Sequence, residues 1–304
     1  MAPRGRLLPT AALLFAAITW GSTVVVGKNA YETMTPASVL VVRLVLAGVV
    51  LLLAFPGYLR MNKRTMAKGI ILGLIFNTGL TLQMVGLDYT PPSLSGFITA
   101  SYVVFTALIS AVVLRTRLPN IAWLAVGMTI VGIAVLSTGH GEMDAEFGFG
   151  AGLTLLSAVA FASHIVLLGR WARSNTYRGL TLMQGLSGAV AALIVAPFVN
   201  VELPATAIDW AQVAFLGIVA GAVTLFLQSW AQSYVAPVAS AIILCSEPVW
   251  GAVFAISFGF EPLTVAVIGG GLLVVSALVL TILPRRIDRR LPKLLADLRL
   301  RRRD

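Results

Sequence analysis

The sequence predicts an all-α membrane protein in which ten transmembrane helices form two inverted repeats of five helices. Three observations lead to this fold class: the composition, a series of apolar segments of spanning length, and motifs that occur twice in the same order. Of the 304 residues, 58% are hydrophobic and only 11% are charged, and the mean hydropathy is +0.93. A soluble domain has about 25% charged residues. A chain with so few charges cannot cover a water-facing surface, so we expect most of its surroundings to be lipid.

Ten segments are long and apolar enough to cross a bilayer, which takes about 20 mostly apolar residues. We expect helices because every backbone amide must be paired inside hydrocarbon. The first segment follows Arg4 and Arg6 as in a signal peptide, but it is long enough to cross and no Ala-x-Ala cleavage site follows it. We therefore interpret it as an uncleaved helix. The predicted spans are residues 7–26, 36–55, 69–87, 93–114, 119–138, 149–169, 180–199, 210–230, 236–258 and 263–283.

The charges between these spans predict the orientation. Of the 22 Lys and Arg residues, 20 fall at the N-terminus, after the even-numbered spans or in the tail, which is one side of the membrane. The opposite loops carry Glu32, Asp88, Glu142, Asp144, Glu146, Glu202, Asp209 and Glu261. By the positive-inside rule both termini are cytoplasmic. The tail after Pro284 is either a basic amphipathic helix on the inner leaflet or a disordered segment, and the distribution of charge argues against nucleic-acid binding.

The repeat is visible in residues that apolar helices rarely share by chance. Trp20-Gly21-Ser22 corresponds to Phe161-Ala162-Ser163, and Gln83, Tyr89, Pro92 and Ser95 correspond in order to Gln228, Tyr234, Pro237 and Ser240. Five helices are an odd number, so the second copy starts from the opposite side of the membrane. This pattern is typical of transporters whose central site opens to each face in turn. We divide the chain into residues 1–140, 141–284 and a basic tail, 285–304.

Glycine and proline predict how the helices meet. The pairs Gly69 with Gly73 and Gly217 with Gly221 have Gly-x-x-x-Gly spacing, which we interpret as close helix packing rather than substrate contact. Pro248 lies inside the ninth predicted helix and should kink it, with a gating role as a hypothesis. Its repeat counterpart is Val103, so we expect the two halves to be kinked unequally.

Charged side chains within spans are expensive and need an explanation. For Arg43 we favour a structural ion pair or snorkelling, with a substrate carboxylate as the alternative. Glu247 either couples protons, binds a substrate ammonium group or forms a helix–helix hydrogen bond. His164 is either structural or a titrating group of a wet cavity.

Uncharged polar and aromatic side chains within spans are the remaining candidates for a site. Amides can hold a small zwitterion, and aromatic rings can line an amphipathic cavity; Gln184 belongs to the same polar set, without an assigned role. The predicted substrate-binding residues are Trp20, Asn77, Gln83, Tyr102, Phe161, His164, Gln228, Trp230 and Ser246. An interfacial or core position remains the alternative for the aromatic residues, Trp230 above all. The single cysteine, Cys245, is expected to be inert.

Enzymatic motifs do not stand out. The sequence has no His-Glu-x-x-His, and its glycine cluster Gly148-x-Gly150-x-Gly152 follows no strand, so it is not a nucleotide fingerprint. With two histidines and one cysteine, we expect no metal centre and no cofactor.

Several motifs together resemble the ten-helix, EamA-type branch of the drug/metabolite transporter superfamily, over about residues 8–284. They are Trp20-Gly21-Ser22, Arg43, Glu247-Pro248-Val249 and Glu261. The family often has Gly-Glu after its fourth helix, where this chain has Arg115-Thr116-Arg117, so the resemblance assigns no role to such a glutamate.

The resemblance implies an exporter in a bacterial inner membrane, acting as a monomer or weak homo-oligomer. Members of the family export amino acids, nucleosides or other metabolites, and some remove drugs. The candidate cavity is similar to that of exporters of aromatic and other hydrophobic amino acids, so we expect amino-acid export by alternating access. A multidrug or nucleoside exporter of the same fold, or a passive metabolite channel, is the alternative.

Overall fold

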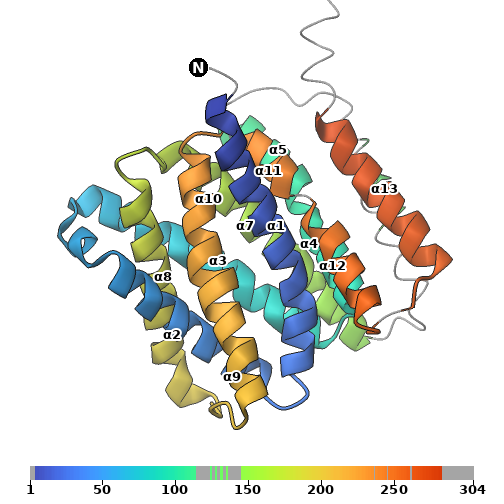
Figure 1. Ribbon diagram of the computed structural model, residues 1–304. Coiled ribbons are helices and arrows are strands. Elements are labelled where there is room, and N and C mark those ends of the chain that lie inside the picture. Colours follow the sequence, from blue (N-terminus) through green and yellow to red (C-terminus); the bar gives the residue numbers. More distant parts are fainter. Residues whose placement is uncertain are drawn as a thin grey trace, which may run out of the picture.

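The structure is a computed structural model that describes residues 4–113, 124, 127–128, 131–132, 135, 145–235, 237–244, 246–260 and 262–282 (Figure 1). Every regular element in these residues is a helix. Most of the fifth predicted span, the Arg115–Arg117 motif, Cys245, Glu261 and the basic tail lie outside them, and so do the predictions made for them.

The described helices follow the predicted spans in order. Seven are long and apolar enough to cross a membrane: Leu7–Ala30, Pro36–Ala54, Lys63–Asp88, Leu94–Val112, Glu146–Trp171, Tyr177–Phe198 and Ala207–Gln232. They match predicted spans one to four and six to eight. The count of ten and the side of the termini remain predictions. The elements are α1 (Arg4–Ala30), α2 (Pro36–Ala54), η1 (Pro56–Arg60), α3 (Lys63–Asp88), α4 (Pro92–Ala100), α5 (Tyr102–Val113), α7 (Ala145–Trp171), α8 (Tyr177–Val195), η2 (Ala196–Phe198), α9 (Ala207–Ala214), the π-helix η3 (Phe215–Val223), α10 (Thr224–Gln232), α11 (Pro237–Leu244), α12 (Glu247–Ser257) and α13 (Val265–Ile282).

The helix boundaries recur along the chain. Both ends of α7 follow the corresponding ends of α1 at one constant offset in residue number, and α8 follows α2 at the same offset. The offset is slightly larger from the first residue of α3 to that of α9, and from the first residue of α4 to that of α11. The matched ends are Arg4/Ala145, Ala30/Trp171, Pro36/Tyr177, Ala54/Val195, Lys63/Ala207 and Pro92/Pro237. The same order of helices is therefore built twice.

Helix contacts recur in the same way. A Cβ added to Gly73 of α3 would lie 2.7 Å from the Gln184 Cα of α8, and a Cβ added to Gly217 of η3 would lie 2.7 Å from the Arg43 carbonyl oxygen of α2. Arg43 and Gln184 are themselves repeat counterparts, since they have the offset that relates α2 to α8. Because α3 contacts α8 as η3 contacts α2, the halves are related by an approximate twofold axis. The packing role predicted for the Gly-x-x-x-Gly pairs is confirmed.

The ninth predicted helix is divided into two helices just before Pro248. The helix α11 ends at Leu244 and α12 begins at Glu247, so Pro248 occupies the first turn of a new helix, where its missing N–H breaks no hydrogen bond. The break falls inside the ninth predicted span, directly before Pro248, and the kink and the gating role given to this proline stay predictions.

The first half is divided at the corresponding point, and the unequal kinks expected of the two halves stay a prediction. The first half is interrupted between α4 and α5 at Ser101, the repeat counterpart of Ser246, although it has no proline there. The Ser101 hydroxyl donates to the Ile98 carbonyl at 2.6 Å, and the Ser246 hydroxyl donates to the Ile243 carbonyl at 2.9 Å. Such local bonds compete with the helical ladder. A serine with this bond thus stands at both interruptions, although the same bond also occurs at Ser22 within the continuous helix α1.

The halves differ in their third helices. The first-half helix α3 is α-helical over its 26 residues, whereas its counterpart contains the nine-residue π-helix η3 between α9 and α10. The repeat offset is larger by one for the pair Gln83/Gln228 than for the pair Gly73/Gly217. The wider turn of a π-helix accommodates one inserted residue, so η3 holds the second repeat in register on both sides of the insertion.

Candidate substrate cavity

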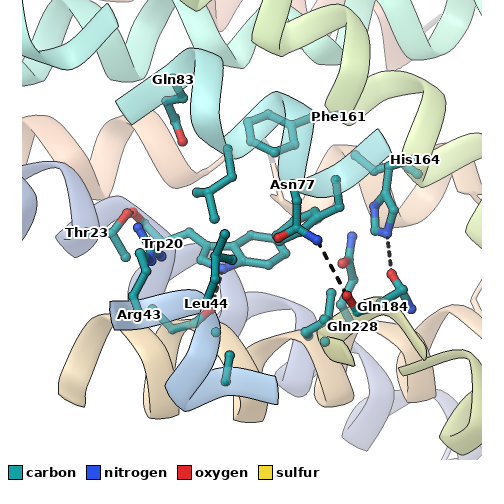
Figure 2. Close-up of a pocket in the computed structure, with 18 of the residues that line it drawn as sticks. Trp20, Thr23, Arg43, Leu44, Asn77, Gln83, Phe161, His164, Gln184 and Gln228 are labelled. Atoms are coloured by element: carbon teal, nitrogen blue, oxygen red, sulfur yellow. Dashed lines mark hydrogen bonds between the residues drawn. The ribbon is translucent and has the colours of Figure 1, made fainter. Parts of the chain in front are cut away.

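A cavity lies at the centre of the described helices, between the two repeats (Figure 2). Its walls come from α1, α2, α3 and α5 of the first half and from α7, α8, η3, α10, α11 and α12 of the second. The space open to the centre of a water molecule is about 60 Å³. One water needs about 10–15 Å³ of such space, so the cavity has room for only a few waters in this conformation.

The residues that line the cavity come in repeat pairs. Of its 21 lining residues, 18 form nine pairs at the spacings of the helices that carry them. Only Ala47, Ile165 and Leu244 line it without their counterparts. The pairs are Trp20/Phe161, Thr23/His164, Arg43/Gln184, Leu44/Gly185, Phe76/Ala220, Asn77/Gly221, Leu80/Leu225, Gln83/Gln228 and Tyr102/Glu247. The cavity therefore sits on the approximate twofold axis.

An aromatic cluster forms one part of the wall. The Phe76 ring centroid lies 6.1 Å from that of Trp20, 5.6 Å from that of Phe161 and 5.0 Å from that of His164. The Trp20 indole N–H donates to the Ala220 carbonyl at 2.9 Å, which ties α1 to the π-helix η3. Phe76 was not among the predicted residues, because a phenylalanine in an apolar helix gives no separate signal.

Hydrogen bonds fix the polar side of the wall. The imidazole Nε2–H of His164 donates to the Gln184 side-chain oxygen at 2.6 Å (Figure 2). The Gln184 amide nitrogen donates to the Ser229 hydroxyl at 3.4 Å. The Asn77 amide donates to the Gly73 carbonyl at 2.6 Å and to the Gln184 carbonyl at 3.4 Å. These bonds hold α3, α7, α8 and α10 together around the cavity.

The two glutamines of the repeat differ in their partners. The Gln83 amide nitrogen donates to the Thr99 hydroxyl at 3.0 Å. The residue that corresponds to Thr99 is Leu244, which has no hydroxyl. The Gln228 side-chain oxygen is buried and accepts no hydrogen bond within the described residues. Gln83 thus joins two helices, while Gln228 presents a vacant acceptor at the cavity.

Arg43 is buried, with only 3% of its surface exposed. Its guanidinium donates to the Met84 sulfur at 3.3 Å and to the Leu216 carbonyl at 3.4 Å. In the part of the chain that the structure describes, no carboxylate pairs with it. Neither of the preferred interpretations, an ion pair and snorkelling, is found among these residues. A thioether is a weak acceptor, so a positive charge at the cavity wall is left with poorly matched partners.

Glu247 is the acidic residue of the cavity wall. Its carboxyl group has no hydrogen-bond partner among the described residues, which argues against the helix–helix hydrogen bond considered for it. Its carbonyl oxygen lies at a close approach of α1 and α12, since a Cβ added to Gly21 would come within 2.6 Å of it. Gly21 therefore keeps Trp20 and Glu247 on adjoining walls.

Three of the predicted residues do not line the cavity. The Trp230 ring packs edge-on against Tyr234 with centroids 5.9 Å apart, and the Ser246 hydroxyl is bonded back to its own turn. Pro248 is buried against Gly96 of α4. Thr23 and Gln184 line the cavity without having been predicted to bind substrate. Thr23 is the repeat counterpart of His164, and Gln184 is that of Arg43. This correspondence in the sequence could have identified both as cavity residues.

Comparisons with known proteins agree with this architecture. The model of the EamA-like transporter family matches the chain twice, at residues 8–138 and 148–283. A protein of Archaeoglobus fulgidus described as an uncharacterized transporter is 28% identical over 275 residues, which cover 90% of this chain and 86% of that protein. One solved crystal structure superposes with a TM-score of 0.69 at 18% identity, covering 92% of this chain and 98% of its own, and shows the same fold. The chain is thus a multi-pass membrane transporter that belongs to the EamA-like transporter family.

Proposed function

We propose that the protein exports amino acids with aromatic or other hydrophobic side chains, by alternating access through the central cavity. The observation that carries the proposal is the pairing of the cavity residues: nine repeat pairs surround one space. Two similar halves can exchange conformations, and a site on their axis then opens to one face and to the other in turn. The basic loops support an orientation with both termini in the cytoplasm of a bacterial cell.

The polar groups of the wall support a zwitterionic substrate. The Arg43 guanidinium can replace its weak bonds to Met84 and Leu216 by a bidentate contact with a carboxylate. Glu247 can accept from the substrate ammonium group, and the vacant acceptor of Gln228 can complete its shell. The cluster around Phe76 can pack against an apolar side chain.

The alternatives differ in what they demand of Arg43. A cationic drug gains nothing from a buried guanidinium, so multidrug export is disfavoured. A nucleoside can stack on the aromatic cluster and form hydrogen bonds with the amides, but it has no anionic group to pair with the Arg43 guanidinium. A passive channel needs a continuous open path, and a space of about 60 Å³ at the centre does not provide one.

The test is uptake by proteoliposomes that contain the purified protein, with labelled amino acids, nucleosides and a cationic dye as the panel. We expect saturable transport and counterflow for phenylalanine, leucine or tryptophan, and little transport of the dye. Transport that grows linearly with concentration and shows no counterflow would contradict alternating access. Saturable transport of nucleosides alone would retain the mechanism and refute the substrate.

A further inference from the structure

A second hollow opens on the outside of the helical bundle beside the central cavity. It is a groove between α2 and α3 with α8 as its floor, and about 270 Å³ of it is open to the centre of a water molecule. Leu40, Leu74, Leu82, Ala192 and Val195 are among its apolar lining residues. All three helices belong to segments long and apolar enough to span the membrane, and Leu74 and Val195 are each 49% exposed. The groove therefore faces the hydrocarbon of the bilayer.

The repeat provides a comparison for this groove. The equivalent place in the second half lies between α8 and α10 over α2, and the counterparts of Thr81 and Ala192 there are Phe226 and Leu51. The Phe226 ring stacks on Phe55 with centroids 5.3 Å apart, and its centroid lies 5.9 Å from that of Tyr177. Two small residues of the first groove are thus replaced by two large ones, while Leu40, Leu44 and Asn77 correspond to the smaller Thr181, Gly185 and Gly221. At the position of Thr81 the second half therefore places an aromatic ring of its own against Phe55 and Tyr177, whereas the first half has no ring there.

Of the three polar side chains that line the open groove, Asn77 and Thr81 are hydrogen-bonded within the protein and Thr78 is exposed. The Thr81 hydroxyl donates to the Asn77 carbonyl at 2.8 Å, and the Asn77 amide is bonded to Gly73 and Gln184. No charged residue is among the described residues that line the groove. An occupant there can gain burial of apolar surface but no salt bridge. This chemistry fits a hydrocarbon chain rather than a polar solute.

We propose that the groove binds an acyl chain of a membrane phospholipid. Two of its residues, Leu44 and Asn77, also line the central cavity, so they separate the chain from the substrate space. The chain takes the place that Phe226 and Leu51 take in the second half, and it completes the cavity wall from the lipid side. The proposal concerns a lipid site and does not depend on which substrate the transporter carries.

The test measures lipid contact directly. A bimane fluorophore on Leu74→Cys, in a Cys245→Ser background, reports from the groove; Val190→Cys, 53% exposed on α8 and outside the groove lining, reports from ordinary lipid-facing surface. Proteoliposomes carry increasing fractions of a phosphatidylcholine with a quenching doxyl group on its acyl chain, in a background of the same lipid without that group. We expect quenching at Leu74 to reach its midpoint at a fraction at least about threefold lower than at Val190.

Substitutions that copy the second groove into the first then separate groove binding from general exposure. Thr81→Phe, or Ala192→Leu if that variant folds better, should fill the groove and bring the Leu74 midpoint to that of Val190. Phe226→Thr, which changes only the second groove, should leave the Leu74 midpoint unchanged. Equal midpoints at both sites in the parent protein, or a preference that survives both filling variants, would overturn the lipid site. Neither readout requires transport, so a failure here is distinct from a failure of the proposed export.

Discussion

The two halves of this transporter share a backbone plan but not a set of polar side chains. The ends of α1 and α2 recur at one constant offset in α7 and α8. The spans formed by α4 with α5 and by α11 with α12 are both interrupted at a serine. At the cavity, however, the repeat counterparts differ in chemistry. The guanidinium of Arg43 corresponds to the amide of Gln184, and the phenol of Tyr102 corresponds to the carboxyl group of Glu247. The shared plan suits a mechanism in which the halves exchange shapes. The differing side chains can give a bound substrate a preferred orientation in the cavity.

The same contrast applies to the backbone at one place. The helix α3 is regular, whereas its counterpart takes up an extra residue in the π-helix η3. The Ala220 carbonyl of η3 accepts the Trp20 indole N–H, and its counterpart Phe76 instead supplies a ring to the aromatic cluster. One half thus contributes a backbone acceptor where the other contributes an aromatic surface.

The largest effect is expected where the halves agree. Gly73→Leu and Gly217→Leu each place a side chain against the backbone of the opposite repeat, within 2.7 Å at Cβ already. Overpacking of this kind costs about 1–3 kcal/mol or more, so both variants should lose most of their thermal stability in detergent. Gly152→Leu is the control, because a Cβ there meets nothing within 4 Å. If only one of the two variants lost thermal stability, the two helix contacts would not be equivalent.

A smaller but more specific effect is expected at the charged pair. Arg43→Gln gives the first half the residue that the second half has at Gln184. Since hydrogen bonds to charged groups are worth about 1.5–3 kcal/mol, the apparent affinity for a transported amino acid should fall about 10- to 100-fold. The fold should persist, because the guanidinium has no carboxylate partner among the described residues.

The readout is the KM for uptake into proteoliposomes, with the melting temperature measured on the same preparation. Arg43→Lys should recover part of the affinity, because the charge is kept and the bidentate geometry is lost. An unchanged KM for Arg43→Gln would refute carboxylate binding at this residue.

Substitution of the two glutamines should affect stability and transport differently. Gln83→Leu removes a bond to Thr99 and should cost about 1 kcal/mol of unfolding free energy. Gln228→Leu removes a buried oxygen without a described partner, so stability should be unchanged or slightly higher while transport slows. Thermal unfolding and uptake rates, measured together, decide this. Equal destabilisation by both substitutions would indicate that Gln228 is structural like Gln83.

The sequence was informative about the fold because the relevant patterns occur twice and can be recognised along the chain without knowledge of how the helices pack. Span length, loop charge and the order of matched residues led to the helices that the structure describes, and the resemblance carried by motifs such as Trp20-Gly21-Ser22 and Glu247-Pro248-Val249 led to the family. Arg43, Asn77 and Glu247 stood out because polar groups are rare in such spans, and all three line the cavity. The partners of these groups were not predictable, since Met84 and Leu216 look like ordinary apolar residues until helices are packed.

The details that the sequence did not reveal have a common physical cause. Proline is conspicuous in a helical pattern, so Pro248 drew attention, while Ser101 and Ser246 passed as ordinary small residues although each stands at an interruption. Whether a serine hydroxyl turns back to its own backbone depends on local geometry that no pattern of hydrophobicity encodes. The inserted residue in η3 was likewise visible only as a change of one in the repeat offset.

The smallest effects are expected for substitutions at the two helix interruptions. Ser101→Ala and Ser246→Ala each remove one hydroxyl bond to a carbonyl of the preceding turn, and should change the unfolding free energy by about 0.5–1 kcal/mol, equally in both halves. Pro248→Ala should change it by less than about 0.5 kcal/mol, because the first turn of α12 requires no N–H at that position. Thermal unfolding of the three variants compares them directly. If Pro248→Ala has the larger effect, proline rather than serine sets the interruption in the second half, and the agreement between the two interrupted spans is a coincidence of position.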